Sequence, residues 1–321
     1  MAVPTKQVFV PGLNRSVAFL DPFLMRRGHT KRRSNLHLLG GAQALPTPTL
    51  PFSWASFATS IATAFPILGN DTVGDCLYAA GCHAGTSQTG SVNAATALTF
   101  NASVVVGDYI TLAGGDVGLD EGEITSGWTA PNSLGSMPLC TIWDHLDVNP
   151  MNAMLAQAMS YAFGGYLFML NVPSKWIKDF SLDGTTIWDA PARPDQENGH
   201  GIWNYGYAAN GNATDLTWGS TVQITPSGID DCDPSAFAVF SPMWFGRDGY
   251  APNGLHISVL APMWVAVGGN SSVLQHVANY PPPSGPAPTP TPTPIPMPTP
   301  NFPALPPGTY DVSGLKSMTV S

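Results

Sequence analysis

The chain has 321 residues, of which 44% are apolar and only 10% are charged, and its formal net charge is −9. The length suits one domain of roughly 230 residues with appendages, or two small domains, and the apolar content is enough for a packed core. Ordinary soluble domains carry about 25% charged residues, so this composition disfavours a freely diffusing monomer. It favours a loop-rich, β-containing protein that works in an assembly or outside a cell. Four cysteines at this length exclude a disulfide scaffold.

Residues 1–45 are predicted to form a basic, extended arm with short strand-like pieces such as Gln7–Val10. Seven of the twelve basic residues lie within the first 33 positions beside a single acid, whereas the remainder of the chain is strongly acidic. The arm is either a solvated segment that aids solubility or a segment that docks on an acidic surface. A neighbouring copy of the acidic body is favoured over nucleic acid as that surface, because the body lacks a basic groove.

The first residues contain no apolar core of a secretion signal, so we expect cytoplasmic synthesis, with incorporation into a virion or extracellular assembly as the alternative location. The uncharged stretch 148–174 has the length of a membrane span. Polar and helix-breaking residues within it, including Asn152, Gln157 and Pro173, argue against a span. We interpret this stretch as a buried helix followed by a strand.

Residues 46–280 are predicted to form the folded domain, which begins with a Pro-Thr linker at Pro46–Pro51. A helix rich in Ala and Gly is expected to start over Cys76–Ala84. Gly114–Glu123 is interpreted as a helix N-terminus, where acidic residues are favoured. Asp147–Asn149 is expected to cap a helix over 151–163. The expected inner face of that helix consists of Met151, Met154, Leu155, Ala158 and Ala162.

The second half of the domain is predicted to be mainly β. The expected strands are Tyr166–Val172, Ile202–Tyr207, Asp215–Gly219, 221–225 and 236–240, with a turn at Asn210-Gly211-Asn212. The fold class is therefore α+β, with a central helix first and an antiparallel β half after it.

Two segments follow the folded domain. Residues 281–307 contain fourteen prolines and form a Pro/Thr-rich linker, which favours polyproline II over a packed core. Residues 308–321 have the composition of a short strand and are too few to fold alone. Such a strand can add to a sheet edge, so we expect self-association through the arm and the tail.

Four residue types occur in an order that indicates a specific chemistry. Asn70 precedes Cys76 by six residues in Gly-Asn-Asp-Thr-Val-Gly-Asp-Cys (69–76), and His200 lies in Asn-Gly-His-Gly (198–201). Trp218 follows in Thr-Trp-Gly. A thiol attacks a carbonyl only as a thiolate, and both a helix N-terminus and an imidazolium lower the pKa of a thiol. The expected nucleophile is Cys76, and the expected base is His200.

The surrounding residues have expected supporting roles. The Asn70 amide and the Cys76 N–H are predicted to stabilise the oxyanion of the tetrahedral intermediate. Trp218 is expected to cover the imidazole, and Asp75 belongs to the loop that aims the amide and the thiol. Gly199 and Gly201 are expected to leave room for a substrate backbone. Taken alone, each of these residues is more typical of core or turn positions, and only their joint order favours a catalytic site.

The motifs resemble those of papain-like cysteine peptidases, over about Asn70 to Phe245, and look like a divergent branch found in bacterial and phage proteins. The resemblance implies a papain-like fold and a thiol hydrolase that cleaves peptide or related amide bonds, with a peptide substrate. We expect no cofactor, and no Cys/His spacing matches a metal site.

One position departs from the family pattern. The family has an asparagine two residues before the tryptophan, which orients the histidine, and Leu216 stands there in this chain. Asp215 is adjacent but is expected on the opposite face of its strand. Either a backbone carbonyl or water orients His200 in a Cys-His dyad, or the enzyme is vestigial. The alternative function is therefore a structural subunit of a virion or extracellular filament that uses this fold as a scaffold, with arm and tail linking copies.

Overall fold

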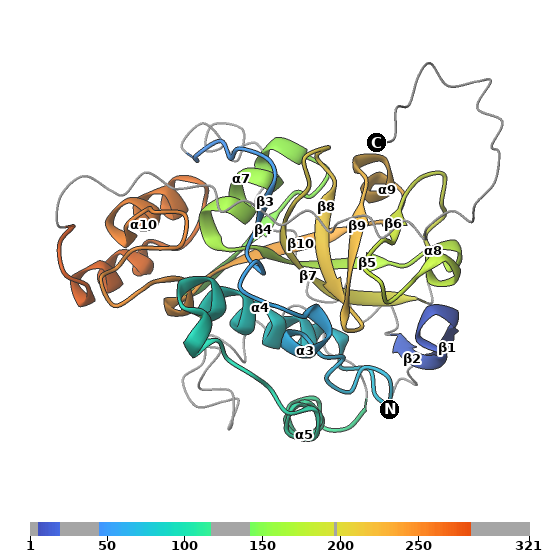
Figure 1. Cartoon of the computed structure of the whole chain (residues 1–321). Coiled ribbons are helices and arrows are strands. Elements are labelled where there is room, and N and C mark those ends of the chain that lie inside the picture. Colours follow the sequence, from blue (N-terminus) through green and yellow to red (C-terminus); the bar gives the residue numbers. More distant parts are fainter. Residues whose placement is uncertain (1–5, 20–44, 117–141, 196–197, 284–321) are drawn as a thin grey trace, which may run out of the picture.

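The computed structural model describes residues 6–19, 45–116, 142–195 and 198–283 (Figure 1). The predicted linker beyond residue 283, the strand-like segment 308–321 and Cys140 lie outside these residues. The predicted domain limits therefore stay predictions. Among the described residues no helix is long and apolar enough to cross a membrane.

A mainly antiparallel sheet forms the centre of the fold. Its strand order is β4-β10-β5-β7-β8-β9-β6, and β3 also pairs with β7. Only the β6–β9 pair is parallel. The strands of this sheet are β3 (Phe52–Ser53), β4 (Asp144–Val148), β5 (Tyr166–Asn171), β6 (Ile187–Trp188), β7 (Gly199–Tyr207), β8 (Ala213–Thr217), β9 (Ser220–Ile224) and β10 (Ser235–Phe240). All five strands expected from the sequence are present, within a few residues at each end, and the α+β class is confirmed.

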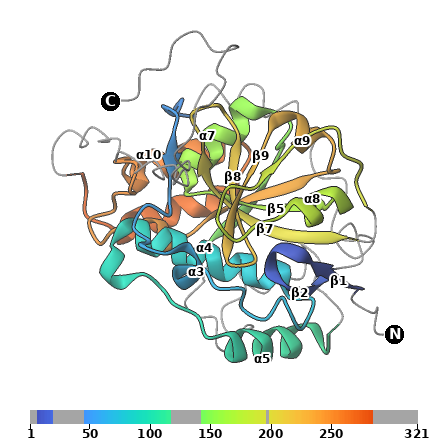
Figure 2. The ribbon, with the colours of Figure 1, turned by 45° about the vertical axis from the view of Figure 1, so that its right-hand side comes forward.

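Helices cover both faces of this sheet. Helix α4 lies against one face and α7 against the other, as both ribbon views show (Figures 1 and 2). The α-helices are α3 (Ile61–Ala64), α4 (Cys76–Val92), α5 (Ala102–Ala113), α7 (Ala153–Phe163), α8 (Ser174–Asp179), α9 (Pro226–Asp230) and α10 (Ile257–Ala266). Short 3-10 turns are η1 (Pro11–Leu13), η3 (Ala94–Thr96), η5 (Pro242–Trp244) and η6 (Ser271–Asn279).

Helix α4 is the central helix that the sequence predicts. Fourteen of its 17 residues are buried, so it has no solvent-facing polar stripe. Its small residues permit this burial, because they let the neighbouring chain come close. A Cβ at Gly90, for example, would lie 2.2 Å from the ring of Phe57. Close packing on several sides holds the N-terminal end of α4 in a fixed position against β7.

Helix α7 confirms the expected helix but corrects its start and its inner face. Asp147 belongs to β4, which pairs with β10, so it cannot cap the helix. The cap is Asn152, whose side chain accepts a hydrogen bond from the Leu155 N–H. Met151 and Met154 are 59% and 68% exposed, because the helix turns these positions away from the sheet.

The described part of the N-terminal arm is a docked hairpin, and its first strand contains the expected strand-like piece Gln7–Val10. Strand β1 (Lys6–Val10) pairs antiparallel with β2 (Arg15–Phe19), and η1 forms the turn between them. Asn14 has a φ of 52°, in the left-handed region that asparagine tolerates, and closes the turn. Figure 2 shows the hairpin in dark blue beside the N-terminal end of α4 and below β7. The chain thus places its arm on its own folded domain.

Most of Gly114–Glu123, the predicted helix N-terminus, lies outside the described residues, and that prediction stays untested. Gly114 ends α5, with a φ of 71° and its N–H bonded to the Ile110 carbonyl. A glycine in this left-handed conformation is a common helix C-cap. Residues 117–123 lie outside the described part of the chain.

Candidate active site

Cys76 is the first residue of α4, at the end of the loop that begins with Gly69. Its side chain is 2% exposed, and its sulfur accepts a hydrogen bond from the Gly201 N–H at 3.3 Å. Burial raises the pKa of the thiol to about 12, and the Gly201 N–H opposes that rise only in part. In this conformation Cys76 therefore carries a protonated thiol at neutral pH.

His200 lies on β7, the strand that packs against α4. Its Nε2 is 2.7 Å from Oγ1 of Thr217, and its ring stacks on Trp218 with centroids 4.7 Å apart. Nδ1 is buried and has no hydrogen-bond partner within the described part of the chain. Burial lowers the pKa of the imidazole to about 3, so His200 is neutral at pH 7.

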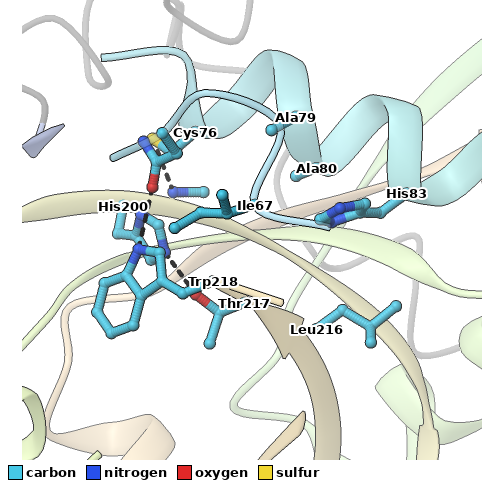
Figure 3. A pocket seen from close by; sticks show the side chains of 11 residues that line it. Ile67, Cys76, Ala79, Ala80, His83, His200, Leu216, Thr217 and Trp218 are labelled. Carbon is cyan, nitrogen blue, oxygen red and sulfur yellow. Dashed lines mark hydrogen bonds between the residues drawn. The ribbon is translucent and has the colours of Figure 1, made fainter. Parts of the chain in front are cut away.

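The sequence predicts no side chain at Leu216 that could orient His200, and the hydroxyl that contacts the imidazole belongs to Thr217. Leu216 points away from His200, toward the other end of the pocket (Figure 3). Thr217 is the next residue, and its hydroxyl faces the imidazole. Asp215 does not contact His200; it lies across from Asn204 in the sheet, and burial raises its pKa to about 8. The side chain that contacts His200 is therefore the threonine of Thr-Trp-Gly, one position after Leu216.

Trp218 reaches its position through a tight turn. It and Gly219 form the two-residue connection between β8 and β9, with φ values of 47° and 76°. Two-residue hairpin turns with positive φ at both positions match the twist of the flanking strands. A positive φ is unusual for a tryptophan, and it brings the indole back over His200.

The indole also fixes the orientation of Asn70. Trp218 Nε1 donates to Asn70 Oδ1 at 3.0 Å. Because an indole N–H can only donate, the amide oxygen must face Trp218 and the NH₂ group must face the other way. That NH₂ group donates to the Ala18 carbonyl at 3.3 Å and to the Val73 carbonyl at 3.5 Å. Trp218 thus contacts both the imidazole and the amide.

The remaining predicted site residues support the backbone around Cys76. Close packing against α4 leaves no room for a side chain at Gly201, because a Cβ there would lie 3.0 Å from Cα and Cδ1 of Leu77. Gly199 pairs with Asn171 in the sheet. Asp75 is 1% exposed, and burial raises the pKa of its carboxyl. The space expected at Gly201 for a substrate is therefore occupied by α4.

Asp116 anchors the loop before Cys76 from outside. Its Oδ1 accepts hydrogen bonds from the Gly74 N–H at 2.9 Å and from the Tyr109 hydroxyl at 2.9 Å. Asp116 thus ties the loop of residues 69–75 to α5.

Side chains from three parts of the chain line one small pocket (Figure 3). Its lining is Ile67, Asn70, Cys76, Ala79, Ala80, His83, His200, Gly201, Leu216, Thr217 and Trp218. Cys76 and His200 lie at one end, and His83 lies at the other, bonded through Nε2 to the Pro66 carbonyl at 2.9 Å. The cavity measures about 10 Å³, which holds at most a single water. A substrate has no room in this state.

The hairpin covers the Cys76 end of the pocket. Phe19 is fully buried, with its ring centroid 5.7 Å from that of His200 and 5.8 Å from that of Trp218. No pattern in the sequence marks Ala18 or Phe19 as site residues, since they lie in an arm that looks irregular. Their position depends on docking of the arm across more than 50 residues of chain.

The described cysteines and acids form no further centre. Cys76, Cys82 and Cys232 are buried, and the described residues contain no group of three or more His, Cys, Asp or Glu side chains that could hold a metal ion.

Comparisons with known proteins give likenesses among solved structures alone. No protein-family model and no curated protein matches the chain. Among solved structures, the chain is similar to Xylellain, a cysteine protease from Xylella fastidiosa. The TM-score is 0.41 at 12% sequence identity, over 63% of this chain and 88% of that chain. At that score and identity the likeness assigns neither fold family nor activity, so the chemistry must follow from the residues of this chain.

Proposed function

We propose that this protein is a papain-like thiol hydrolase that cleaves peptide or related amide bonds. The observation that carries the proposal is that Cys76, at the first position of α4, and His200, on β7, line one end of the same pocket with Asn70. These residues come from distant parts of the sequence, and their types match nucleophile, base and oxyanion donor.

The Thr217 hydroxyl supports a defined role for each imidazole nitrogen. We assign the exchangeable proton to Nε2, so that Nε2–H donates to Thr217 Oγ1 and Nδ1 exchanges a proton with the thiol. Thr217 is then a positioning residue in place of the usual asparagine. Its hydroxyl can donate or accept, so it holds the ring in place and does not select the tautomer.

In the proposed reaction, the Cys76 sulfur attacks the substrate carbonyl carbon while His200 Nδ1 takes the thiol proton. The Asn70 NH₂ group and the Cys76 N–H stabilise the oxyanion. The proton then passes to the leaving amine as the C–N bond breaks, and water hydrolyses the thioester. Trp218 is a positioning residue for both His200 and Asn70, because it stacks on one and bonds to the other.

A peptide that carries a thiol-reactive electrophile tests this proposal. The full-length chain is incubated with it for hours near neutral pH, and the modified cysteine is located by mass spectrometry. We expect modification of Cys76 that His200→Gln abolishes, with the buried Cys232 as the internal control. Modification of both cysteines at equal rates, or of Cys76 independently of His200, contradicts the proposal.

A structural role is the second candidate, and the closed pocket is the observation that favours it. In this state the thiol is protonated, the imidazole is neutral and the cavity admits no substrate. A subunit of a virion or filament needs the fold and not the reaction. This function predicts large oligomers, measured by light scattering, that dissociate on deletion of residues 1–45 or 308–321. A monomer that is unaffected by both deletions would rule it out.

A further inference from the structure

A second cavity, which we call the α8 cavity, lies where α8 begins and the loop after β6 passes beside it. Its volume is about 400 Å³, and its lining is Pro173, Ser174, Lys175, Pro191, Ala192 and Arg193. A volume of this size is typical of sites that bind small molecules or side chains, whereas the pocket at Cys76 holds at most one water. The α8 cavity can therefore take a ligand in the state that the structure shows.

The few cations of the folded domain gather at this cavity. In a chain of net charge −9, residues 46–280 contain only four basic side chains, which are Lys175, Lys178, Arg193 and Arg247. Three of the four lie between positions 175 and 193, and two of these line the cavity. Two cations that face one cavity favour an anionic ligand there.

Both lining cations are available to a ligand. Arg193 is exposed and makes no hydrogen bond or ion pair with another residue in the described part of the chain. Lys175 pairs with Asp179 at 2.9 Å, but the two side chains are 59% and 47% exposed. Such pairs are weak because water screens them, so Lys175 can turn to an anion. Asp189 also interacts with Lys175, but its Oδ1 already accepts hydrogen bonds from two hydroxyl groups at the start of α9.

The other nearby carboxylates bind neutral donors and hold the walls of the cavity. Asp231 accepts a hydrogen bond from the Ala192 N–H at 2.9 Å, and Asp195 accepts one from the Ser174 hydroxyl at 2.7 Å. The first bond ties the loop after β6 to the end of α9, and the second ties the same loop to the start of α8. These acids thus shape the cavity without neutralising Arg193.

The α8 cavity lies at the same end of the β5–β7 pair as His200. In the sheet His200 pairs with Leu170, and Pro173 of the cavity wall follows three residues later. At a rise of about 3.3 Å per residue, these three residues span about 10 Å. An extended peptide covers that distance with about three residues.

A series of contacting rings fixes the cavity relative to His200. Trp176, the residue after Lys175, stacks on Trp188 with centroids 5.2 Å apart. Trp188 meets Trp218 at 6.2 Å, and Trp218 stacks on His200 at 4.7 Å. All three indoles are buried, so close packing holds the cavity and the imidazole at a constant separation.

We propose, on the basis of the hydrolase function above, that the α8 cavity is a subsite for a carboxylate group of the substrate, bound by Arg193 and Lys175. Arg193 binds the carboxylate through two parallel N–H donors, and Lys175 adds a point charge. The carboxylate belongs to an acidic side chain or to the C-terminus of a peptide, about three residues from the bond that is cut.

Two pairs of peptides, each pair differing in one charge, test this inference. The first pair is an acetylated tetra-alanine peptide with a free or an amidated C-terminus. The second is an acetylated and amidated alanine peptide that contains one glutamate or one glutamine. Ligand-observed NMR titration measures the Kd of each peptide for the full-length Cys76→Ala protein, at low and at high salt. The substitution prevents turnover, so the measurement does not depend on the reaction.

We expect the charged member of at least one pair to bind about tenfold more tightly than the neutral member, and high salt to remove most of that difference. The pair that shows the preference identifies the source of the carboxylate. Arg193→Gln should abolish the preference, and Lys175→Gln should reduce it about threefold. Equal binding within both pairs, or a preference that survives Arg193→Gln, would overturn the inference.

The matched control is Arg247→Gln, which should leave the preference unchanged. Arg247 is the remaining basic side chain of the domain outside positions 175–193 and is also exposed. It lies in the segment before α10, and α10 and α8 are at opposite ends of the molecule (Figures 1 and 2). Since all three substituted side chains are exposed, none of these variants threatens folding.

Hydrolysis of the same peptides by the wild type and by Arg193→Gln separates the two proposals. Faster cleavage of the charged peptide by the wild type alone supports both. A binding preference without any cleavage retains the carboxylate site and contradicts the hydrolase. Cleavage of charged and neutral peptides at equal rates by both proteins contradicts the subsite and retains the hydrolase.

Discussion

The two ends of the pocket under α4 each hold a buried histidine, and they differ in the partners that surround it. His200 contacts the Thr217 hydroxyl, the Trp218 indole and Phe19, and it shares its end with Cys76. His83 bonds to the Pro66 carbonyl and meets the edge of Phe65.

Burial lowers the pKa of both, to about 3 for His200 and about 4 for His83. Desolvation alone therefore does not mark a catalytic histidine, and the neighbouring groups assign the role.

The largest expected difference between the two ends is in reactivity. His200→Gln should lower the rate of Cys76 modification by a peptide electrophile by roughly 10² to 10⁴-fold, the usual contribution of a general base. His83→Gln should leave that rate within about twofold, because the introduced glutamine amide can still donate a hydrogen bond to the Pro66 carbonyl. Mass spectrometry of both variants measures this, and equal losses in the two would break the comparison.

The second largest expected effect is on kcat, when the Asn70 amide at the His200 end of the pocket is removed. Asn70→Ala should lower kcat for peptide hydrolysis by roughly 10² to 10³-fold, the loss typical of one oxyanion donor. Alkylation by iodoacetamide passes through no oxyanion, so it should not fall. Steady-state kinetics gives the first value. A parallel fall in both rates would assign Asn70 a role in folding and not in the reaction.

At acidic pH the two histidines should have similar effects on the free energy of unfolding. Each histidine is neutral in the fold and binds a proton when unfolded, because its pKa is lowered from 6.5 by burial. The unfolded state therefore holds more protons between about pH 4 and 6.5, and the free energy of unfolding falls as the pH falls through that window.

Each histidine contributes a slope of up to about 1.4 kcal/mol per pH unit. Urea unfolding at several pH values should show that His83→Gln and His200→Gln reduce the slope by similar amounts. A slope unchanged in both variants would mean that other groups control the acid stability.

The smallest expected effect on peptide hydrolysis comes from substitution of Thr217, whose hydroxyl contacts His200. Thr217→Val keeps the shape and removes the hydroxyl, and the loss of one hydrogen bond of about 1 kcal/mol should slow peptide hydrolysis about fivefold. Thr217→Ser should restore the rate, since it restores the acceptor. The pH–rate profile of kcat/KM should shift in the valine variant, because the base loses its hydrogen bond to the hydroxyl. A rate and a profile identical to the wild type would remove Thr217 from the proposed site.

Much of the fold followed from local patterns. The strands over residues 166–172, 202–207 and 236–240 and the helix that begins at Cys76 were predictable, because apolar runs, turn residues and small-residue packing act over a few positions. The start of α7 was wrong, since Asp147 and Asn152 are equally good caps by type. Pairing of β4 with β10, a contact across the chain, decided between them.

The sequence alone determined the candidate set: one thiol at a helix start, one imidazole, one amide and one indole, in an order that indicates thiol chemistry. The tertiary structure alone decided which group orients His200, how Trp218 sets the Asn70 amide, and that the hairpin closes the site. These contacts join residues far apart in the chain: the bond from Trp218 to Asn70 spans 148 positions, and the ring contact of Phe19 with Trp218 spans more. Composition and spacing carry no information about such contacts, because they form only when the sheet, the central helix and the arm pack together.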